Sequence, residues 1–357
     1  MTIQHNRQRH GMMRLRRGYG ETWAKTILMG EHSVVYGFPA VAVPIRSLKM
    51  RAWAVPSKPG RPQMLRALGY YGPLDQAPAS FGGVQKAVEE AKAFAGAGQY
   101  GFDIVTRSDF PAGRGLGSSA AASGAVVRAI LNSCGAPASS EELVRLTNRA
   151  EVITHGHPSG LDAVTTCGDD PVLFAKGAMT ALVVCMPAYL VIADSGVAGS
   201  TKEAVDDVRG QYDRHHAEVQ SILEGLGELA ADAARDLQEG GLNSLGRRMN
   251  RAHALLDALN ISHPIANDLV VQARRSGALG AKMTGGGLGG CIIALAADDL
   301  SAHRIRRDLL ASGAPAVWIH PLNQLDVEVG GALDRDMETM ADPDITDDGV
   351  DASNVHC

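Results

Sequence analysis

Aromatic residues are scarce in this sequence, and long hydrophobic runs are missing. Phe, Trp and Tyr together make up 4% of the 357 residues, whereas glycine alone contributes 41. A folded core must therefore be built mainly from Ala, Val, Leu and Ile. No apolar run approaches the roughly 20 residues of a membrane-spanning helix, and no apolar segment follows the basic N-terminus as in a secretory signal. We expect a chain that neither spans a membrane nor carries such a signal.

Cysteine is also rare, and its positions follow no pattern. The five cysteines form no CxxC pair and no metal-ligand spacing. Scattered thiols in odd number are typical of a reducing compartment rather than of a disulfide framework. We therefore expect a cytoplasmic protein with free cysteines.

Positive charge is not in surplus, since the formal net charge is −5 at pH 7. This balance argues against nucleic acid as the main partner. The charge is unevenly placed: residues 1–20 carry five Arg, and residues 334–357 are rich in Asp. We expect these two ends to be disordered tails, with two folded domains, 21–186 and 187–333, between them.

The hydrophobic pattern predicts an α+β fold in two halves. In the first half we expect strands at 24–29, 34–45 (broken by a turn), 50–55 and 102–106, and helices at 84–95, at 120–131 and from 139 onward. Strands at 182–184 and 189–193 flank the expected boundary. The second half is mostly helical from 201 to 273, with breaks at Gly210, Gly225 and Gly240, and continues with strands at 281–283, 292–295 and 316–319 and a helix at 298–312. This order of elements is typical of a ferredoxin-like sandwich.

The strongest local feature is a glycine-rich loop in front of a small-residue helix, with the sequence Pro111-Ala112-Gly113-Arg114-Gly115-Leu116-Gly117-Ser118-Ser119. Alternate glycines let backbone N–H groups converge on an anion, and the dipole of a helix N-terminus favours negative charge. A hydroxyl at such a place can also bind Mg²⁺. The spacing matches neither GxxxxGK[ST] nor GxGxxG. The loop indicates phosphate binding, against the plainer alternative of a flexible turn that caps a buried helix.

Two carboxylates, Glu151 and Asp162, lie on either side of a Gly/Pro turn. One carboxylate of such a pair can hold a cation while the other handles a proton. The plainer alternative is a surface glutamate and a turn-forming aspartate. His155 and His157 suggest zinc, but no further ligands stand at a suitable spacing, so we do not expect a zinc site.

Two further segments combine glycine with charged residues. Lys25 lies on an expected strand that runs into Gly30, Glu31 and His32. A lysine there can stabilise phosphoryl charge, although it could also be a strand-edge lysine in solvent. Residues 282–291 hold five glycines between two expected strands, which indicates a close backbone approach or simply a loose hairpin.

In this order, the four segments resemble the motifs of the GHMP kinase superfamily over about residues 25–290. Within it, the sequence is most similar to the mevalonate kinase family, on the evidence of GEHSVVYG at 30–37 and HGHPSGLD at 155–162. The Gly-Glu-His-Thr-Asp-Tyr stretch expected of galactokinases is absent. The resemblance implies an N-terminal domain like ribosomal protein S5 domain 2, a ferredoxin-like C-terminal domain, and an active site in the cleft between them.

The resemblance also implies roles for single residues. Asp162 would orient or deprotonate the substrate hydroxyl with the help of Lys25, and Ser119 and Glu151 would hold Mg²⁺. The phosphates of ATP would be bound by the glycine-rich loop at 111–119. The remaining set would form the substrate side of the site, and its members are Glu31, His32, Thr201, Gly285 and Gly286.

The implied activity is the ATP-dependent phosphorylation of the C5 hydroxyl of (R)-mevalonate to 5-phosphomevalonate, in isoprenoid biosynthesis, by an enzyme that the family leads us to expect as a homodimer. Two departures bear on the substrate: Thr284 is followed by Gly-Gly-Gly instead of Gly-Ala-Gly, and Asp162 is followed by Ala163 instead of Asn. The alternatives are a related kinase for phosphomevalonate, for the 3-hydroxyl of mevalonate or for a sugar, and a ligand-sensing pseudokinase. The intact Lys25, Ser119, Glu151 and Asp162 argue against the pseudokinase.

Overall fold

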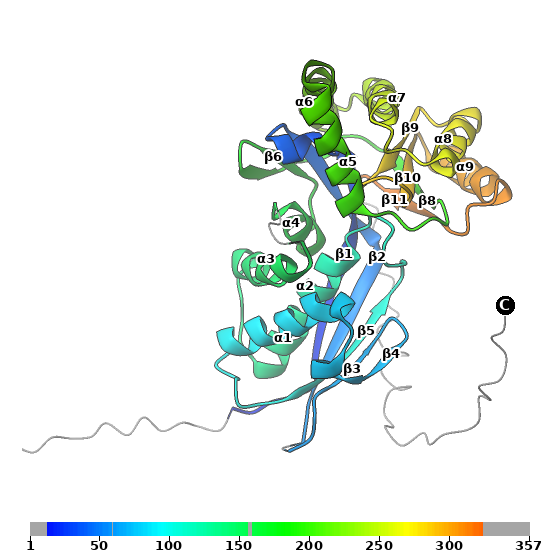
Figure 1. Cartoon of the computed structure of the whole chain (residues 1–357). Coiled ribbons are helices and arrows are strands. Elements are labelled where there is room, and N and C mark those ends of the chain that lie inside the picture. Colours follow the sequence, from blue (N-terminus) through cyan, green and yellow to red (C-terminus); the bar gives the residue numbers. More distant parts are fainter. Residues whose placement is uncertain (1–12, 59, 156–158, 324–357) are drawn as a thin grey trace, which may run out of the picture. The chain divides into compact units, whose positions relative to one another are not determined.

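The first half of the chain is organised around a large, mostly antiparallel sheet (Figure 1). The computed structural model describes residues 13–58, 60–155 and 159–323, and within them the sheet has seven strands in the order β4-β3-β5-β2-β6-β7, with β1 paired to β2. The strands are β1 (Gly18–Met29), β2 (Ala40–Pro56), β3 (Met64–Ala67), β4 (Tyr70–Pro73), β5 (Phe102–Ser108), β6 (Val172–Ala175) and β7 (Ala178–Ala181).

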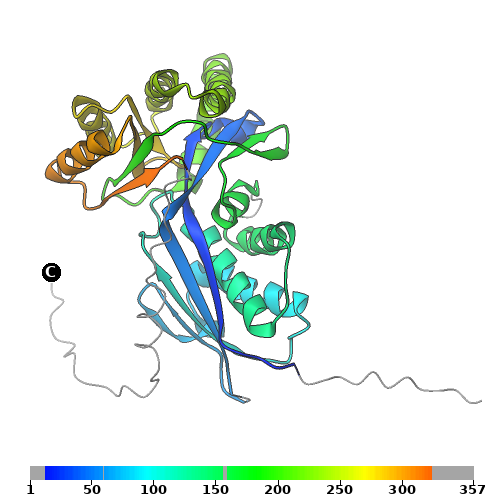
Figure 2. The same ribbon diagram turned by 180° about the vertical axis from the view of Figure 1, so that it is seen from behind.

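Helices cover one face of this sheet. They are α1 (Gly82–Phe94), α2 (Ser118–Cys134), α3 (Ser140–His155) and α4 (Leu161–Cys167), and three short 3₁₀ turns, η1 (Ser33–Tyr36), η2 (Leu74–Gln76) and η3 (Ala79–Phe81), complete the half. Helices α1, α2 and α3 lie in front of the strands in Figure 1, whereas the strands lie in front in Figure 2.

Helix α2 packs directly onto β1 because two strand residues lack a side chain. A Cβ on Gly18 would lie 1.9 Å from the carbonyl oxygen of Ala129, and a Cβ on Gly20 would lie 2.1 Å from that of Ala125. Glycine is therefore required at both positions, and the close approach sets the middle and C-terminal turns of α2 directly on β1.

The second half contains a four-stranded sheet in the order β11-β8-β10-β9. Its elements are β8 (Tyr189–Asp194), α5 (Thr201–Arg214), α6 (His216–Glu239), α7 (Leu242–Ala258), α8 (Pro264–Arg275), β9 (Gly280–Thr284), β10 (Cys291–Ala296), α9 (Asp299–Ala311) and β11 (Val317–Pro321). Numbered within this half, the strand order is 4-1-3-2 with antiparallel pairing. The arrangement confirms the predicted ferredoxin-like sandwich.

Strand β2 bends at an irregularity in its pairing with β1. Trp23 pairs with Lys49, but the next residue, Ala24, pairs with Ile45, so residues 46–48 have no partner on β1. Such a bulge bends a strand and changes which side chains face the core.

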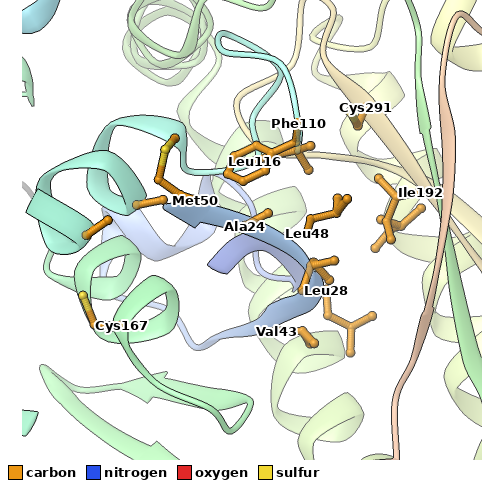
Figure 3. Close-up of a cluster of buried hydrophobic side chains, with 14 of the residues drawn as sticks. Ala24, Leu28, Val43, Leu48, Met50, Phe110, Leu116, Cys167, Ile192 and Cys291 are labelled. Atoms are coloured by element: carbon orange, nitrogen blue, oxygen red, sulfur yellow. The ribbon is translucent and has the colours of Figure 1, made fainter. Parts of the chain in front are cut away.

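The bulge lets both ends of β2 contribute to one core. Since side chains alternate along a strand, an unbroken strand would place odd- and even-numbered residues on opposite faces. Here one cluster contains the odd-numbered residues before the bulge and the even-numbered residues after it, namely Val41, Val43, Ile45, Leu48, Met50, Ala52 and Ala54. Figure 3 shows Val43, Leu48 and Met50 together with Ala24 and Leu28 of β1.

Several expectations need correction. Strand β1 begins at Gly18, so residues 18–20 are not part of a tail, because their contacts with α2 hold them in the fold. Residues 34–45 form η1 followed by the start of β2 rather than two strands. Residues 182–184 form no strand, whereas the short β6–β7 hairpin and the two-turn helix α4 were not predicted.

The helices of the second half are also longer than expected. Helix α5 continues through Gly210, and α6 continues through Gly225, because an interior glycine costs a helix only about 1 kcal/mol and packing overrides it. The predicted tail residues 1–12 and 334–357 lie outside the described residues. Within the described part of the chain, none of the helices combines the length and the apolar character that a membrane crossing requires.

Candidate active site

The glycine-rich loop leads into the first turn of α2. Gly113, Gly115 and Gly117 have φ values of 70°, 75° and 72°, a left-handed conformation that favours glycine. Gly117 is the residue that precedes the helix, and Ser118 is its first residue. The backbone therefore follows the left-handed path at alternate positions, as the sequence pattern predicts for a loop that surrounds an anion.

The loop is fixed to strand β1 at Lys25. The backbone N–H of Lys25 donates to the carbonyl oxygen of Leu116 at 3.0 Å, and the Leu116 side chain is buried. A Cβ on Gly117 would lie 2.7 Å from Cγ of Lys25. The aliphatic part of Lys25 thus lies against the end of the loop, which requires glycine there for space as well as for φ.

Lys25 and Asp162 form an ion pair. Nζ of Lys25 lies 2.9 Å from Oδ1 of Asp162, and the lysine side chain is 7% exposed whereas the aspartate side chain is 39% exposed. Asp162 stands in the first turn of α4, which begins directly after the left-handed Gly160 (φ 82°). The two residues predicted to carry the chemistry are thus in contact, and the carboxylate is open on one side.

Ser119 and Glu151 are the second predicted pair that the structure brings together. The hydroxyl of Ser119 donates to Oε1 of Glu151 at 2.7 Å, and Glu151, on α3, is 2% exposed. A carboxylate oxygen and a hydroxyl oxygen side by side suit a hard cation. The described residues contain no group of three or more His, Cys, Asp and Glu side chains able to hold a metal. The two oxygen donors fit Mg²⁺, which keeps water and phosphate oxygens as its other ligands. The side chains of His155 and His157, considered for zinc in the sequence, lie outside the described part of the chain.

Glu31 is buried and pairs with a residue that the sequence analysis did not single out. Its Oε1 accepts from Nζ of Lys282, on β9, and both side chains are fully buried. Nζ also donates to the carbonyl oxygen of Met283 at 2.7 Å. Burial raises the pKa of Glu31 and lowers the pKa of Lys282, because desolvation disfavours both charged forms, and the charge of each partner opposes the shift of the other. Oε2 of Glu31 is buried without a hydrogen-bond partner.

His32 has an unusual backbone and a buried ring. Its φ is 59°, which is rare for a residue with a side chain, and its Nε2 lies 2.7 Å from the carbonyl oxygen of Gly286. Burial lowers its pKa, so the ring is neutral at pH 7 and Nε2–H is the donor. The strained turn thereby aims the imidazole at the loop between β9 and β10.

That loop, residues 285–290, contacts the other predicted segments. The Cα of Gly115 lies 3.1 Å from where a Cβ on Gly285 would be, and a Cβ on Gly286 would lie 2.6 Å from Cα of Thr201. Just before the loop, the hydroxyl of Thr284 donates to the carbonyl oxygen of Ile27 at 2.9 Å. The glycines are needed here because three backbone segments meet at contact distance.

The predicted residues therefore converge, with two qualifications. Arg114, predicted to lie at the nucleotide, has its guanidinium paired with Asp194 at 2.9 Å. His157 and the rest of 156–158 lie outside the described residues. Sequence reasoning missed Asp194 as well as Lys282. Lysine at 282 could have been suspected, because a charged residue inside an apolar strand is rarely buried without a partner.

Comparison with known proteins gives the class. The GHMP kinases N terminal domain matches residues 84–169, and the GHMP kinases C terminal domain matches residues 233–314. The chain belongs to the GHMP kinase family, and the predicted resemblance is confirmed at that level.

The more specific similarity is to mevalonate kinases. The mevalonate kinase of Thermococcus onnurineus (strain NA1) is 35% identical over 78% of this chain and 89% of its own length, and that of Pyrococcus horikoshii is 35% identical over 76% and 87%. Among solved structures, L. major mevalonate kinase in complex with R-mevalonate is 25% identical, with a TM-score of 0.76 over 87% of this chain and 98% of that chain. Mevalonate kinase from methicillin-resistant Staphylococcus aureus MRSA252 is 30% identical, with a TM-score of 0.69 over 86% and 99%.

Proposed function

We propose that this protein is a mevalonate kinase, which transfers the terminal phosphoryl group of ATP to the C5 hydroxyl of (R)-mevalonate. The observation that carries the proposal is the Lys25–Asp162 pair directly against the end of the glycine-rich loop. The pair supplies an acceptor for a hydroxyl proton and a positive charge beside a phosphate-binding loop. The mevalonate kinases at 35% identity support this choice of acceptor.

In this proposal the chain acts mainly by positioning and charge. Phosphoryl transfer through a loose transition state needs alignment of the reacting oxygens and neutralisation of spread negative charge. The N–H groups at 113–119 and the N-terminus of α2 hold the phosphates. Asp162 orients the C5 hydroxyl and accepts its proton. Lys25 stabilises the negative charge that develops on the transferring phosphoryl group.

Ser119 and Glu151 are the residues that would hold Mg²⁺. When bound, the ion supplies neutralisation of charge on the transferring phosphoryl group. Glu31, His32, Thr201, Gly285 and Gly286 would form the wall on the acceptor side, where His32 and Thr201 lie against Gly286.

The test is ADP release from the purified protein with Mg-ATP, with and without (R)-mevalonate. We expect release that depends strongly on mevalonate, with phosphate at C5 in the product by ³¹P NMR. A matched panel of phosphomevalonate and galactose, at equal concentrations, separates the related kinases, and phosphate at C3 identifies a 3-kinase. A protein that binds ATP and turns over none of these alcohols would contradict the proposal and favour the pseudokinase.

A further inference from the structure

The side chain of Arg114 leaves the glycine-rich loop and pairs with the end of strand β8. Its Nε lies 2.9 Å from Oδ1 and 3.1 Å from Oδ2 of Asp194, and its Nη2 donates to the carbonyl oxygen of Gly196 at 3.4 Å. The arginine side chain is 19% exposed and the aspartate side chain 6%. Because little water reaches this pair, its attraction is weakly screened, and the attraction holds the two side chains in this geometry.

Asp194 is itself rigidly held. Its Oδ1 accepts from the backbone N–H of Gly196 at 2.8 Å, and its own N–H donates to the carbonyl oxygen of Ala316 at 3.0 Å. Its strand position is paired with Cys291 of β10. The carboxylate is therefore a fixed point of the second half of the chain, to which Arg114 connects the loop of the first half.

Backbone contacts around this ion pair also join the glycine-rich loop to the segment that follows β8. The N–H of Gly199 donates to the carbonyl oxygen of Gly113 at 3.2 Å. A Cβ on Gly290 would lie 3.1 Å from the carbonyl oxygen of Arg114. Residues 195–200 thus contact both the glycine-rich loop and the β9–β10 loop, and they lead directly into Thr201 at the start of α5.

We infer that Arg114 is a positioning residue, which acts through Asp194 to hold the glycine-rich loop in its phosphate-binding shape, and that it is not a ligand of the phosphates. The inference rests on the proposed nucleotide site, though not on the identity of the acceptor alcohol. The loop path has left-handed residues at three alternate positions, and a glycine chain loses much conformational freedom on adopting one such path. The ion pair reduces that freedom before the nucleotide arrives, which improves affinity by preorganisation.

The test compares Arg114→Met, Asp194→Asn and the double variant, with the Kd of Mg-ATP measured by calorimetry in the absence of any acceptor. We expect each single variant to raise the Kd about tenfold, the scale of one charge-assisted hydrogen bond. The double variant should be no weaker than the weaker single variant, because both remove the same connection. Arg114→Lys, which keeps the charge and restores one contact, should recover part of the loss.

A direct phosphate contact gives a different pattern. Arg114→Met would then weaken ATP binding, whereas Asp194→Asn would leave it unchanged or tighten it by releasing the guanidinium, and this result would overturn the inference. Losses in unfolding free energy without any change in the Kd or the KM of ATP would overturn it as well.

Arg248→Met is the matched control. Arg248 pairs with Asp232 and Asp236 between α6 and α7, with its Nε 2.7 Å from Oδ2 of Asp236. It should lower the unfolding free energy as the other ion-pair variants do. The Kd of ATP should stay within about twofold of the wild-type value, a difference of about 0.4 kcal/mol in binding free energy. A wild-type protein that binds Mg-ATP without phosphorylating mevalonate would refute the proposed acceptor, and the comparison of Arg114 with Asp194 would still decide the inference.

Discussion

Asp162 differs from the other acidic side chains of the site in its exposure. Its side chain is 39% exposed, whereas Glu31 and Glu151 are buried. Only Asp162 is therefore open to an incoming alcohol. We expect Asp162→Asn to lower kcat by about 10²–10⁴-fold, the usual contribution of a positioned base, with little change in the KM of ATP. Steady-state ADP release measures kcat and the KM of ATP, and a thermal melt checks that the variant is folded. Asp75→Asn, at an exposed aspartate, is the control, and a fully active Asp162→Asn enzyme would rule out the role.

Glu151 should act on the cation rather than on the alcohol. Its carboxylate is buried and accepts from Ser119, and an amide in its place keeps the size but loses the charge that attracts Mg²⁺. We expect Glu151→Gln to raise the Mg²⁺ concentration for half-maximal activity at saturating ATP several-fold. A Mg²⁺ titration that matches the wild type would identify Glu151 as a structural residue only.

At this scale the sequence predicted two of the side-chain pairs of the site and missed the residues that complete two others. Lys25 with Asp162, and Ser119 with Glu151, could be anticipated because each residue lies in a recognisable motif. Lys282 with Glu31 could not, because 251 positions separate them and only the pairing of β9 within the second sheet brings Lys282 to the end of β1. Asp194 carries no local signal at all, since an aspartate at the end of a strand is common.

Between elements, the contact of β1 with α2 depends on missing side chains. An alanine at position 20 would place its Cβ 2.1 Å from the carbonyl oxygen of Ala125, so strand and helix must separate. We expect Gly20→Ala to cost about 3 kcal/mol of unfolding free energy. Urea denaturation gives this value. The control is Gly98→Ala, whose Cβ would meet nothing within 4 Å and which should change stability by less than about 1 kcal/mol. Equal effects of the two substitutions would contradict the packing argument.

A buried histidine on helix α7 should make the stability of the protein depend on pH. His253 is buried and accepts from the backbone N–H of Met283, in β9, at 3.4 Å. Burial, with the nearby charges of Arg274 and Lys282, lowers its pKa from 6.5 to about 4, against the opposing charge of Asp257. Below pH 6.5 the unfolded chain therefore binds more protons than the folded chain, and stability falls as the pH falls toward 4.

The loss from His253 alone should be about 2 kcal/mol between pH 7 and pH 5. We expect His253→Gln to show a correspondingly smaller fall in unfolding free energy over this interval, measured by urea denaturation at both pH values. His303→Gln, at a histidine whose side chain is 58% exposed, should keep the wild-type fall. A wild-type slope in His253→Gln would show that the ring does not titrate in this way.

The elements themselves were predicted unevenly. The second half follows from its order of strands and helices, because long, periodic segments and a known topology constrain it. In the first half, the expected strands at 34–45 and 50–55 are joined in one strand, β2, from Ala40 to Pro56. The hairpin β6–β7 gave no signal, because its strands are short and β7 is mostly exposed.

For the molecule as a whole, the Glu31–Lys282 pair connects the two sheets where no water can replace either partner. Lys282→Met leaves a buried carboxylate without a countercharge, which should cost about 3–5 kcal/mol. The double variant Glu31→Leu/Lys282→Met removes both charges and should regain most of the loss. Urea unfolding followed by circular dichroism and by tryptophan fluorescence tests this. A double variant as unstable as Lys282→Met would contradict the account.

The same experiment reports on cooperativity. Trp23 and Trp53 lie in the large sheet, and Trp318 lies in the small one. Residues up to Asn323 belong to one structural unit, so the fluorescence and dichroism transitions of the wild type should coincide. The domain boundary predicted at 186–187 falls between β7 and β8. It stays a prediction, because the residues on both sides belong to the same structural unit, with contacts through β1, β9 and the glycine loops.

The bulge in β2 has a consequence for how chain length can vary in this protein. Because side chains alternate with a period of two, the three unpaired residues at 46–48 set the phase of everything that follows. An insertion of one residue there would turn either Val41, Val43 and Ile45 or Leu48, Met50 and Ala52 outward. An insertion of two would keep both sets inside. Insertions or deletions that the fold tolerates at this point should therefore change the chain length by an even number of residues.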